Sequence, residues 1–234
     1  MVACTHPHRF GAFRCVDRFD RKYRGRTFHL YPFLTRLAFP MLTPYKAAFS
    51  KAADAVARPF LALGFSPNGI TLFGLLLGLA TCVLFVWSRN AVLFGFLMIL
   101  CGLFDAVDGA AARLTDRVTK FGSYLDAMCD RVSEVAAILA GAYVSGHWML
   151  SLVLAGGVLL TSYAKARAAM EVPVSNAEWP DLMERTERGV VYMIGMMLWG
   201  FFSGRFFGRD LFFWWLLGLD LAVWGTVVQR ILRA

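Results

Sequence analysis

Four aspartates occur within 26 residues at spacings that bring side chains together on helices. Asp105 and Asp108 are three residues apart, and Asp126 and Asp130 are four residues apart. On a helix, each spacing places both carboxylates on one face. Ionised carboxylates that face one another repel, so the arrangement calls for a cation. An all-oxygen ligand set suits Mg²⁺, Mn²⁺ or Ca²⁺ rather than zinc. The aspartates therefore predict divalent-metal chemistry.

The surroundings of these acids are apolar, with hydrophobic runs over residues 91–104 and 135–144. An ionised carboxylate near hydrocarbon costs at least ~2.5 kcal/mol, so such residues usually mark function. The alternative is that the acids are solvated or pair with Arg113 and Arg131. That alternative leaves unexplained why they fall on two helical faces with small residues between them.

The composition predicts an all-α membrane protein. The chain of 234 residues is 58% hydrophobic and only 17% charged, which gives room for about six spans of ~20 residues each. Its five cysteines form no C-x-x-C pair, which argues against a zinc site or a disulfide framework. We expect six transmembrane helices at residues 70–87, 91–113, 122–144, 148–168, 189–202 and 211–232.

An N-terminal amphipathic interfacial helix is predicted over residues 45–63, where apolar residues recur at helical spacing. Residues 1–44 are interpreted as a basic cytoplasmic extension, and residues 45–234 as the transmembrane domain. The net charge of +8 resides in residues 1–60, which hold 11 Lys/Arg and 3 Asp/Glu. No folded basic module interleaved with aromatics is evident, so nucleic-acid binding is not expected.

The distribution of Lys/Arg also predicts orientation. Six spans place both termini and the acidic segment on one side of the membrane together with 21 Lys/Arg, against three on the other side. The positive-inside rule then predicts a cytoplasmic active site and cytoplasmic termini.

The aspartates belong to a longer pattern, D-x2-D-G-x2-A-R-x8-G-x3-D-x3-D, which specifies eight positions from Asp105 to Asp130. At each of them the chain resembles the CDP-alcohol phosphotransferase family, and the resemblance covers roughly residues 45–232. It implies transfer of a phosphatidyl-type group from a CDP-lipid (CDP-diacylglycerol or CDP-archaeol) to an alcohol, with release of CMP. It also implies a homodimer.

The resemblance assigns roles to individual residues. It implies two Mg²⁺ ions, with Mn²⁺ as the alternative, held by Asp105, Asp108, Asp126 and Asp130, and it makes Asp130 the base that takes the acceptor's proton. Asn68 could equally be an ordinary helix cap. The residues implied to bind the nucleotide and CDP-lipid are Asn68, Gly69, Ile70, Thr71, Gly109, Arg113 and Thr119.

Three further segments resemble the branch of the family that makes phosphatidylinositol phosphate or archaetidylinositol phosphate. They read S-Y-x-K-A-R-A (162–168), E-R-x-E-R (184–188) and T-x-x-Q-R (226–230). A phosphorylated acceptor needs a cluster of cations, unlike uncharged inositol. Arg185 and Arg233 are interpreted as headgroup anchors. The predicted acceptor-phosphate ligands are Lys165, Arg167, Arg188 and Arg230.

Three alternatives stay open at this point. Glycerol 3-phosphate is a second candidate acceptor, since it also carries a phosphate. An intramembrane prenyl transferase would use paired aspartate motifs as well, but it forms no CMP. An intramembrane cation carrier would show metal flux without chemistry.

Overall fold

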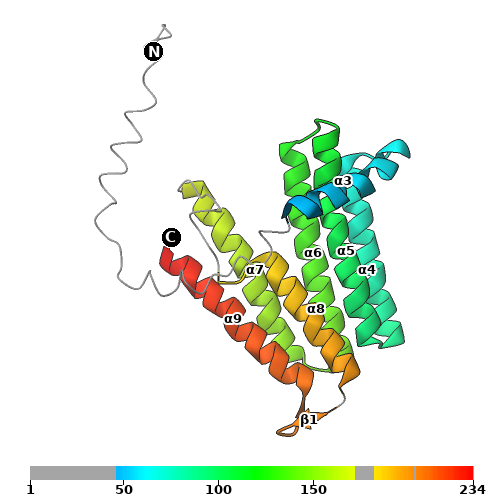
Figure 1. The fold of residues 1–234 in the computed structure, drawn as a ribbon. Helices are drawn as coiled ribbons and strands as arrows, with labels where there is room; N and C mark the ends of the chain where they lie inside the picture. Colours follow the sequence, from blue (N-terminus) through cyan, green and yellow to red (C-terminus); the bar gives the residue numbers. More distant parts are fainter. Residues whose placement is uncertain (1–45, 172–181, 203, 234) are drawn as a thin grey trace, which may run out of the picture. The chain divides into compact units, whose positions relative to one another are not determined.

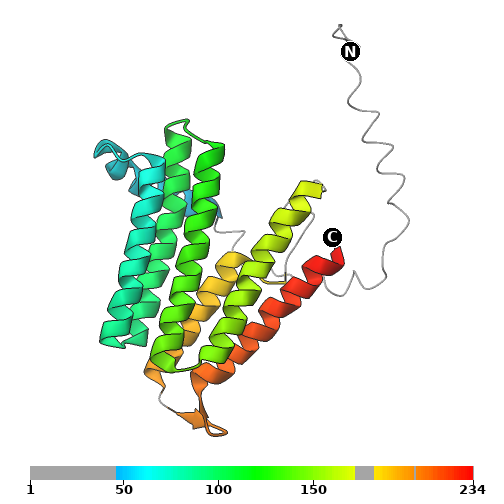
Figure 2. The same ribbon diagram turned by 180° about the vertical axis from the view of Figure 1, so that it is seen from behind.

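A computed structural model of the chain describes residues 46–171, 182–202 and 204–233. The predicted extension, residues 1–44, lies outside this range. In the described residues the chain is mostly helical, and a short hairpin joins the last two helices (Figures 1 and 2). The elements are α3 (Lys46–Ala62), α4 (Pro67–Ser88), α5 (Ala91–Leu114), α6 (Lys120–Ser145), α7 (Trp148–Glu171), α8 (Arg185–Phe201), β1 (Arg205–Phe206), β2 (Arg209–Asp210) and α9 (Leu211–Arg233).

Four of the described helices are long and apolar enough to cross a membrane: α4, α5, α7 and α9. They coincide with four of the six predicted spans. Helix α6 begins with a polar half that contains Asp126, Asp130, Arg131 and Glu134. Helix α8 has 17 residues and begins with charged ones. Length and composition therefore mark four spans, and six crossings stay a prediction.

Helix packing is organised around α4 and α9. Helix α4 packs against both α5 and α6, α9 packs against α7 and α8, and α5 packs against α8. The main core lies where these helices meet, and it includes Phe85 and Phe94, whose rings stack with centroids 4.2 Å apart. Trp199 and Phe212 stack at 5.3 Å where α8 meets α9.

Helix α3 forms a smaller apolar cluster with α5. Ala53 and Ala57 on α3 are buried against Val107, Ala110 and Ala111 on α5. Small residues at these positions let the two helices approach closely. The helix expected over 45–63 is therefore present as Lys46–Ala62, and its place in the membrane interface stays a prediction.

The predicted beginning of the first span was three residues too late. Helix α4 begins at Pro67, and the cap is Ser66, whose Oγ accepts a hydrogen bond from the backbone N–H of Gly69 at 3.1 Å. Serine before a proline at the first helical position is a favourable helix beginning. Asn68 is therefore not the helix cap.

The all-α expectation omitted one element. Arg205 pairs with Asp210 and Phe206 with Arg209 in an antiparallel hairpin. Phe207 and Gly208 form its turn with φ of 48° and 77°, the left-handed conformation that such tight turns require. Two strands of two residues each leave no periodic pattern by which the hairpin could be recognised in the sequence.

Replacement of Gly195 by alanine is expected to destabilise the contact between α8 and α9. A Cβ at this position would overlap the indole ring of Trp215, which is held by a 2.9 Å hydrogen bond to the carbonyl of Val191. Overpacking of this kind costs about 1–3 kcal/mol. Thermal unfolding in detergent should show a lowered midpoint for Gly195→Ala. Gly218→Ala is the matched control, because a Cβ there meets nothing within 4 Å. Equal midpoints would contradict the prediction.

Candidate active site

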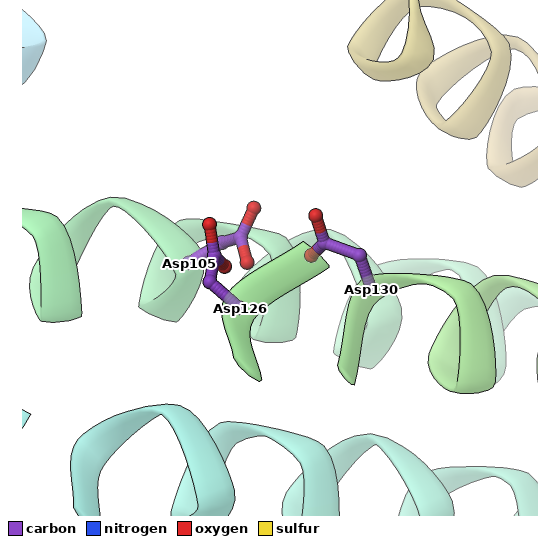
Figure 3. Close-up of side chains that lie close together, drawn as sticks. All are labelled: Asp105, Asp126 and Asp130. Carbon is purple, nitrogen blue, oxygen red and sulfur yellow. The ribbon is translucent and has the colours of Figure 1, made fainter. Parts of the chain in front are cut away.

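Three carboxylates from two helices come together in the halves of α5 and α6 that are nearer to their connecting turn. Asp105 lies on α5, and Asp126 and Asp130 lie one turn apart on α6; one oxygen of each lies within 4.8 Å of the others. Figure 3 shows the side chains of Asp105 and Asp126 next to each other, with Asp130 further along α6. Helix α4 packs on both α5 and α6 and so sets the distance between them. The predicted juxtaposition of the two aspartate pairs is present for these three residues.

The cluster fits a divalent cation. Its ligands are carboxylate oxygens only, which Mg²⁺ and Mn²⁺ prefer. The Oδ1 atom of Asp126 is buried and has no hydrogen-bond partner among the described residues. An unpaired buried carboxylate oxygen is costly, and coordination of a cation removes that cost.

Asp108 lies next to this cluster, but its carboxylate is hydrogen-bonded to α4 instead. Its side chain is buried, and its Oδ2 accepts a hydrogen bond of 2.6 Å from Thr71 Oγ1. Asp108 remains close enough to Asp105 and Asp126 to interact with them electrostatically. The structure thus links the predicted nucleotide residue Thr71 to a predicted metal ligand, and it does not group Asp108 with the other three.

Arg185 contacts the carboxylates directly, so its interpretation as a headgroup anchor was wrong. Its Nη2 donates to Asp105 Oδ2 at 2.6 Å, and its Nη1 donates to Asp130 Oδ2. The alternative partners are engaged elsewhere: Arg131 binds Glu134 at 2.9 Å, and Arg113 lies 3.9 Å from Asp54. The sequence contained two arginines three residues apart in E-R-x-E-R, and spacing alone could not tell which one faces the acids.

A second group of charged side chains lies further along α6 from the three carboxylates and includes Glu134 and Arg188. Arg188 is 3% exposed, and its Nη2 lies 3.3 Å from Glu134 Oε1. Arg131 and Arg230 lie within electrostatic range of Arg188. Arg230 is also buried and donates to the carbonyl of Thr161. Two arginines, Arg131 and Arg188, therefore share one glutamate.

This group contains two of the four predicted acceptor ligands, Arg188 and Arg230. Lys165 and Arg167 lie near the end of α7, where Arg167 is exposed and lies 3.8 Å from Met170 Sδ. Sequence reasoning missed the part that Arg131 and Glu134 play. Their i,i+3 spacing directly after Asp130 could have indicated a charge pair on the same helix.

The predicted nucleotide residues lie around the beginnings of α4 and α6. Thr119 caps α6, with its Oγ1 accepting from the N–H of Gly122 at 3.0 Å. A Cβ on Gly122 would lie 3.1 Å from Asn68 Oδ1, so Asn68 reaches the same point. Ile70 is fully buried with Val107 in the small cluster under α3, so this predicted nucleotide residue exposes neither its side chain nor its backbone.

Gly109 and Arg113 are close to each other on α5. A Cβ on Gly109 would lie 3.5 Å from Arg113 Nη1, so the guanidinium extends along the helix surface that the glycine leaves open. The Arg113 side chain is 57% exposed. It is therefore accessible to a ligand from solvent.

Membrane-length apolar helices, three clustered carboxylates and neighbouring arginines are the features expected of a membrane enzyme that acts on a phosphate with the help of a divalent cation. A family model described as CDP-alcohol phosphatidyltransferase matches residues 65–226, and the chain belongs to this family. The protein is therefore an integral membrane transferase, as the aspartate pattern predicted.

Two similar proteins are named as synthases of inositol phosphate lipids. The chain is 29% identical over 196 residues to archaetidylinositol phosphate synthase from Pyrococcus horikoshii, covering 83% of this chain and 96% of that protein. It is 32% identical over 169 residues to phosphatidylinositol phosphate synthase from Mycobacteroides abscessus, covering 69% and 73%.

Crystal structures of phosphatidylinositol phosphate synthase from Mycobacterium tuberculosis are similar in fold. One with CDP-DAG bound gives a TM-score of 0.67 at 25% identity and covers 77% of this chain and 92% of that one. Another, in complex with manganese and citrate, also gives 0.67 at 25% identity and covers 76% and 87%.

Proposed function

We propose that this enzyme transfers a phosphatidyl-type group from a CDP-lipid to a hydroxyl of inositol phosphate and releases CMP. The observation that carries the choice of acceptor is that Arg131 and the buried Arg188 share the single carboxylate of Glu134, one turn beyond Asp130 on α6, with Arg230 within electrostatic range of Arg188. Such a group suits an acceptor that is itself a phosphate dianion. The relatives named for inositol phosphate products support the same choice.

Asp105, Asp126 and Asp130 would hold two Mg²⁺ or Mn²⁺ ions together with Asp108. When bound, the ions neutralise the charge of the pyrophosphate and of the leaving nucleotide. The manganese complex of a relative supports a divalent cation in this fold.

Asp130 takes the proton from the acceptor hydroxyl. The resulting oxygen attacks the β-phosphorus of the CDP-lipid, the bond from that phosphorus to the bridging oxygen breaks, and CMP leaves. Asp130 is 8% exposed, so its carboxylate is shielded from water that would compete for the proton. The Asp130 carboxylate also accepts a hydrogen bond from Arg185 at the beginning of α8.

The cytidine nucleotide would occupy the region between the beginnings of α4 and α6. Thr71, Thr119 and the side chain of Asn68 offer polar atoms there, Gly69 contributes backbone, and the buried Ile70 anchors the beginning of α4. Gly109 leaves space for the pyrophosphate, and Arg113 supplies a positive charge. The lipid chains stay in the bilayer. We also propose that the enzyme is a homodimer, as the family resemblance implies. The positive-inside rule predicts that the active site and both termini lie in the cytoplasm.

A panel of acceptors tests the proposed substrate. Purified protein with Mg²⁺ and CDP-diacylglycerol or CDP-archaeol should release CMP with inositol phosphate. Inositol should give a rate lower by about 10²-fold or more, because it lacks the phosphate that these arginines would bind. CMP release with glycerol 3-phosphate alone would support the alternative acceptor and contradict this choice.

Removal of divalent metal is expected to abolish CMP release. EDTA should stop the reaction, and Mg²⁺ or Mn²⁺ added in excess should restore it, because the carboxylates alone repel the pyrophosphate. Turnover that is indifferent to EDTA would contradict the cation site. Metal flux in proteoliposomes without any CMP would instead support an intramembrane cation carrier.

A further inference from the structure

A polar cavity lies at the end of the helices opposite the aspartates. It has a volume of about 640 Å³ and is lined by residues of the α4–α5 turn, the end of α8 and the hairpin, including Arg89, Asn90, Trp199, Arg205 and Asp210. Helix α5 begins here and reaches Asp105 fourteen residues later, ~21 Å away at ~1.5 Å per residue. In Figure 1 the hairpin and the α5–α6 turn lie at opposite ends of the helices.

The charge of this cavity is unbalanced. Arg89 and Arg205 are exposed, and neither forms an ion pair within the part of the chain that the structure describes. The one acid in the lining, Asp210, is already engaged. Its Oδ1 lies 2.8 Å from His147 Nε2 and accepts from the backbone N–H of Phe213 at 2.9 Å. Two arginines are therefore available for an anion.

An apolar hollow adjoins the cavity across the hairpin. It has a volume of about 360 Å³ and is lined by Phe206, Phe207, Leu211 and Trp214. Phe207 is 94% exposed at the tip of the hairpin, and its ring packs edge-on against Trp214 with centroids 6.2 Å apart. Aromatic side chains of this kind are typical of the membrane–water interface. Arg205 precedes Phe206 on β1, so the cationic and the aromatic surfaces share one strand.

We propose that this end of the protein binds one anionic phospholipid of the leaflet opposite the active site. The lipid phosphate lies between Arg89 and Arg205, where guanidinium groups can donate paired hydrogen bonds to its oxygens. One acyl chain lies along the hollow formed by Phe206, Phe207 and Trp214. A free phosphate would satisfy the arginines but would leave the aromatic hollow unfilled, so the paired surfaces favour a lipid. The lipid fixes the hairpin and the α4–α5 turn to each other.

Native mass spectrometry of the full chain, delipidated in detergent and then titrated with phosphatidylglycerol or phosphatidylcholine, tests this proposal. The wild type should retain phosphatidylglycerol in preference. The double variant Arg89→Gln/Arg205→Gln should lose one bound phosphatidylglycerol per chain, with affinity lower by about tenfold or more. Phe207→Ser should weaken binding of both lipids. Inorganic phosphate at the same concentration should not displace the lipid.

Arg209→Gln is the matched control. Arg209 lies on the same hairpin, but its guanidinium is placed over the Phe213 ring, 5.1 Å from the centroid, and it does not line the cavity. This variant should bind phosphatidylglycerol like the wild type. Equal retention by the double variant, equal binding of phosphatidylcholine, or an equal loss in Arg209→Gln would overturn the proposal. CMP release in detergent should be unchanged in the double variant, which separates this site from the catalytic one.

Discussion

Replacement of Asp130 by asparagine is expected to lower the rate of CMP release by about 10³-fold, because it removes both the proposed general base and one proposed cation ligand. An asparagine has nearly the same shape but neither the charge nor the basicity of the carboxylate. The fold should persist, because the loss of one buried negative charge leaves fewer repelling carboxylates. The measurement is kcat for CMP release at saturating CDP-lipid and acceptor.

Asp116→Asn is the matched control for this substitution. Asp116 lies in the turn between α5 and α6, outside the carboxylate cluster, with a left-handed φ of 51° that asparagine adopts readily. Its variant should keep the wild-type rate. An Asp130→Asn enzyme within a few-fold of wild type would remove Asp130 from the mechanism.

The variant Arg185→Gln is expected to bind Mn²⁺ about tenfold more tightly than the wild type, since a nearby positive charge is removed. The guanidinium donates to Asp105 and Asp130, which supply two of the three carboxylates in the cation cluster. One oxygen lone pair cannot serve an arginine and a cation at once, so the two compete. Titration of Mn²⁺ followed by electron paramagnetic resonance measures the affinity without any turnover.

Two further variants separate competition from a general charge effect. Arg185→Lys keeps the charge but cannot donate to two carboxylates at once through a planar guanidinium, so it should also bind Mn²⁺ more tightly. Arg131→Gln removes an equal charge that is bonded to Glu134 and Ser162 instead, and its effect should be smaller. If Arg185→Lys matches the wild type, competition by bridging is wrong.

The elements that follow from local periodicity were predictable from the sequence. The i,i+3 and i,i+4 spacings placed the aspartates on helix faces, and apolar runs located the helices to within a few residues. Helix α4 was placed too late because Ser66 and Pro67 form a stronger helix beginning than Asn68. A serine followed by a proline is a local signal, so this beginning could have been predicted from the sequence.

Contacts between distant segments were not predictable in the same way. Whether Arg185 or Arg188 reaches the carboxylates depends on how α8 rotates against α6, which follows from packing of many side chains and not from spacing. The hydrogen bond from Thr71 to Asp108 joins residues 37 positions apart, and no local pattern encodes it. The family pattern predicted which aspartates bind the cations, whereas only the structure showed which residue each aspartate contacts.

The packing of α3 against α5 has a practical consequence for protein engineering. Helix α3 covers Ala110 and Ala111, which directly follow Asp108 and Gly109 in the sequence. Loss of α3 is therefore expected to disturb the part of α5 that positions the aspartates. Shortened versions made for crystallisation should therefore begin before residue 46, and affinity tags belong upstream of that point. A version starting after residue 62 would expose an alanine face and be prone to aggregate even with every catalytic side chain intact.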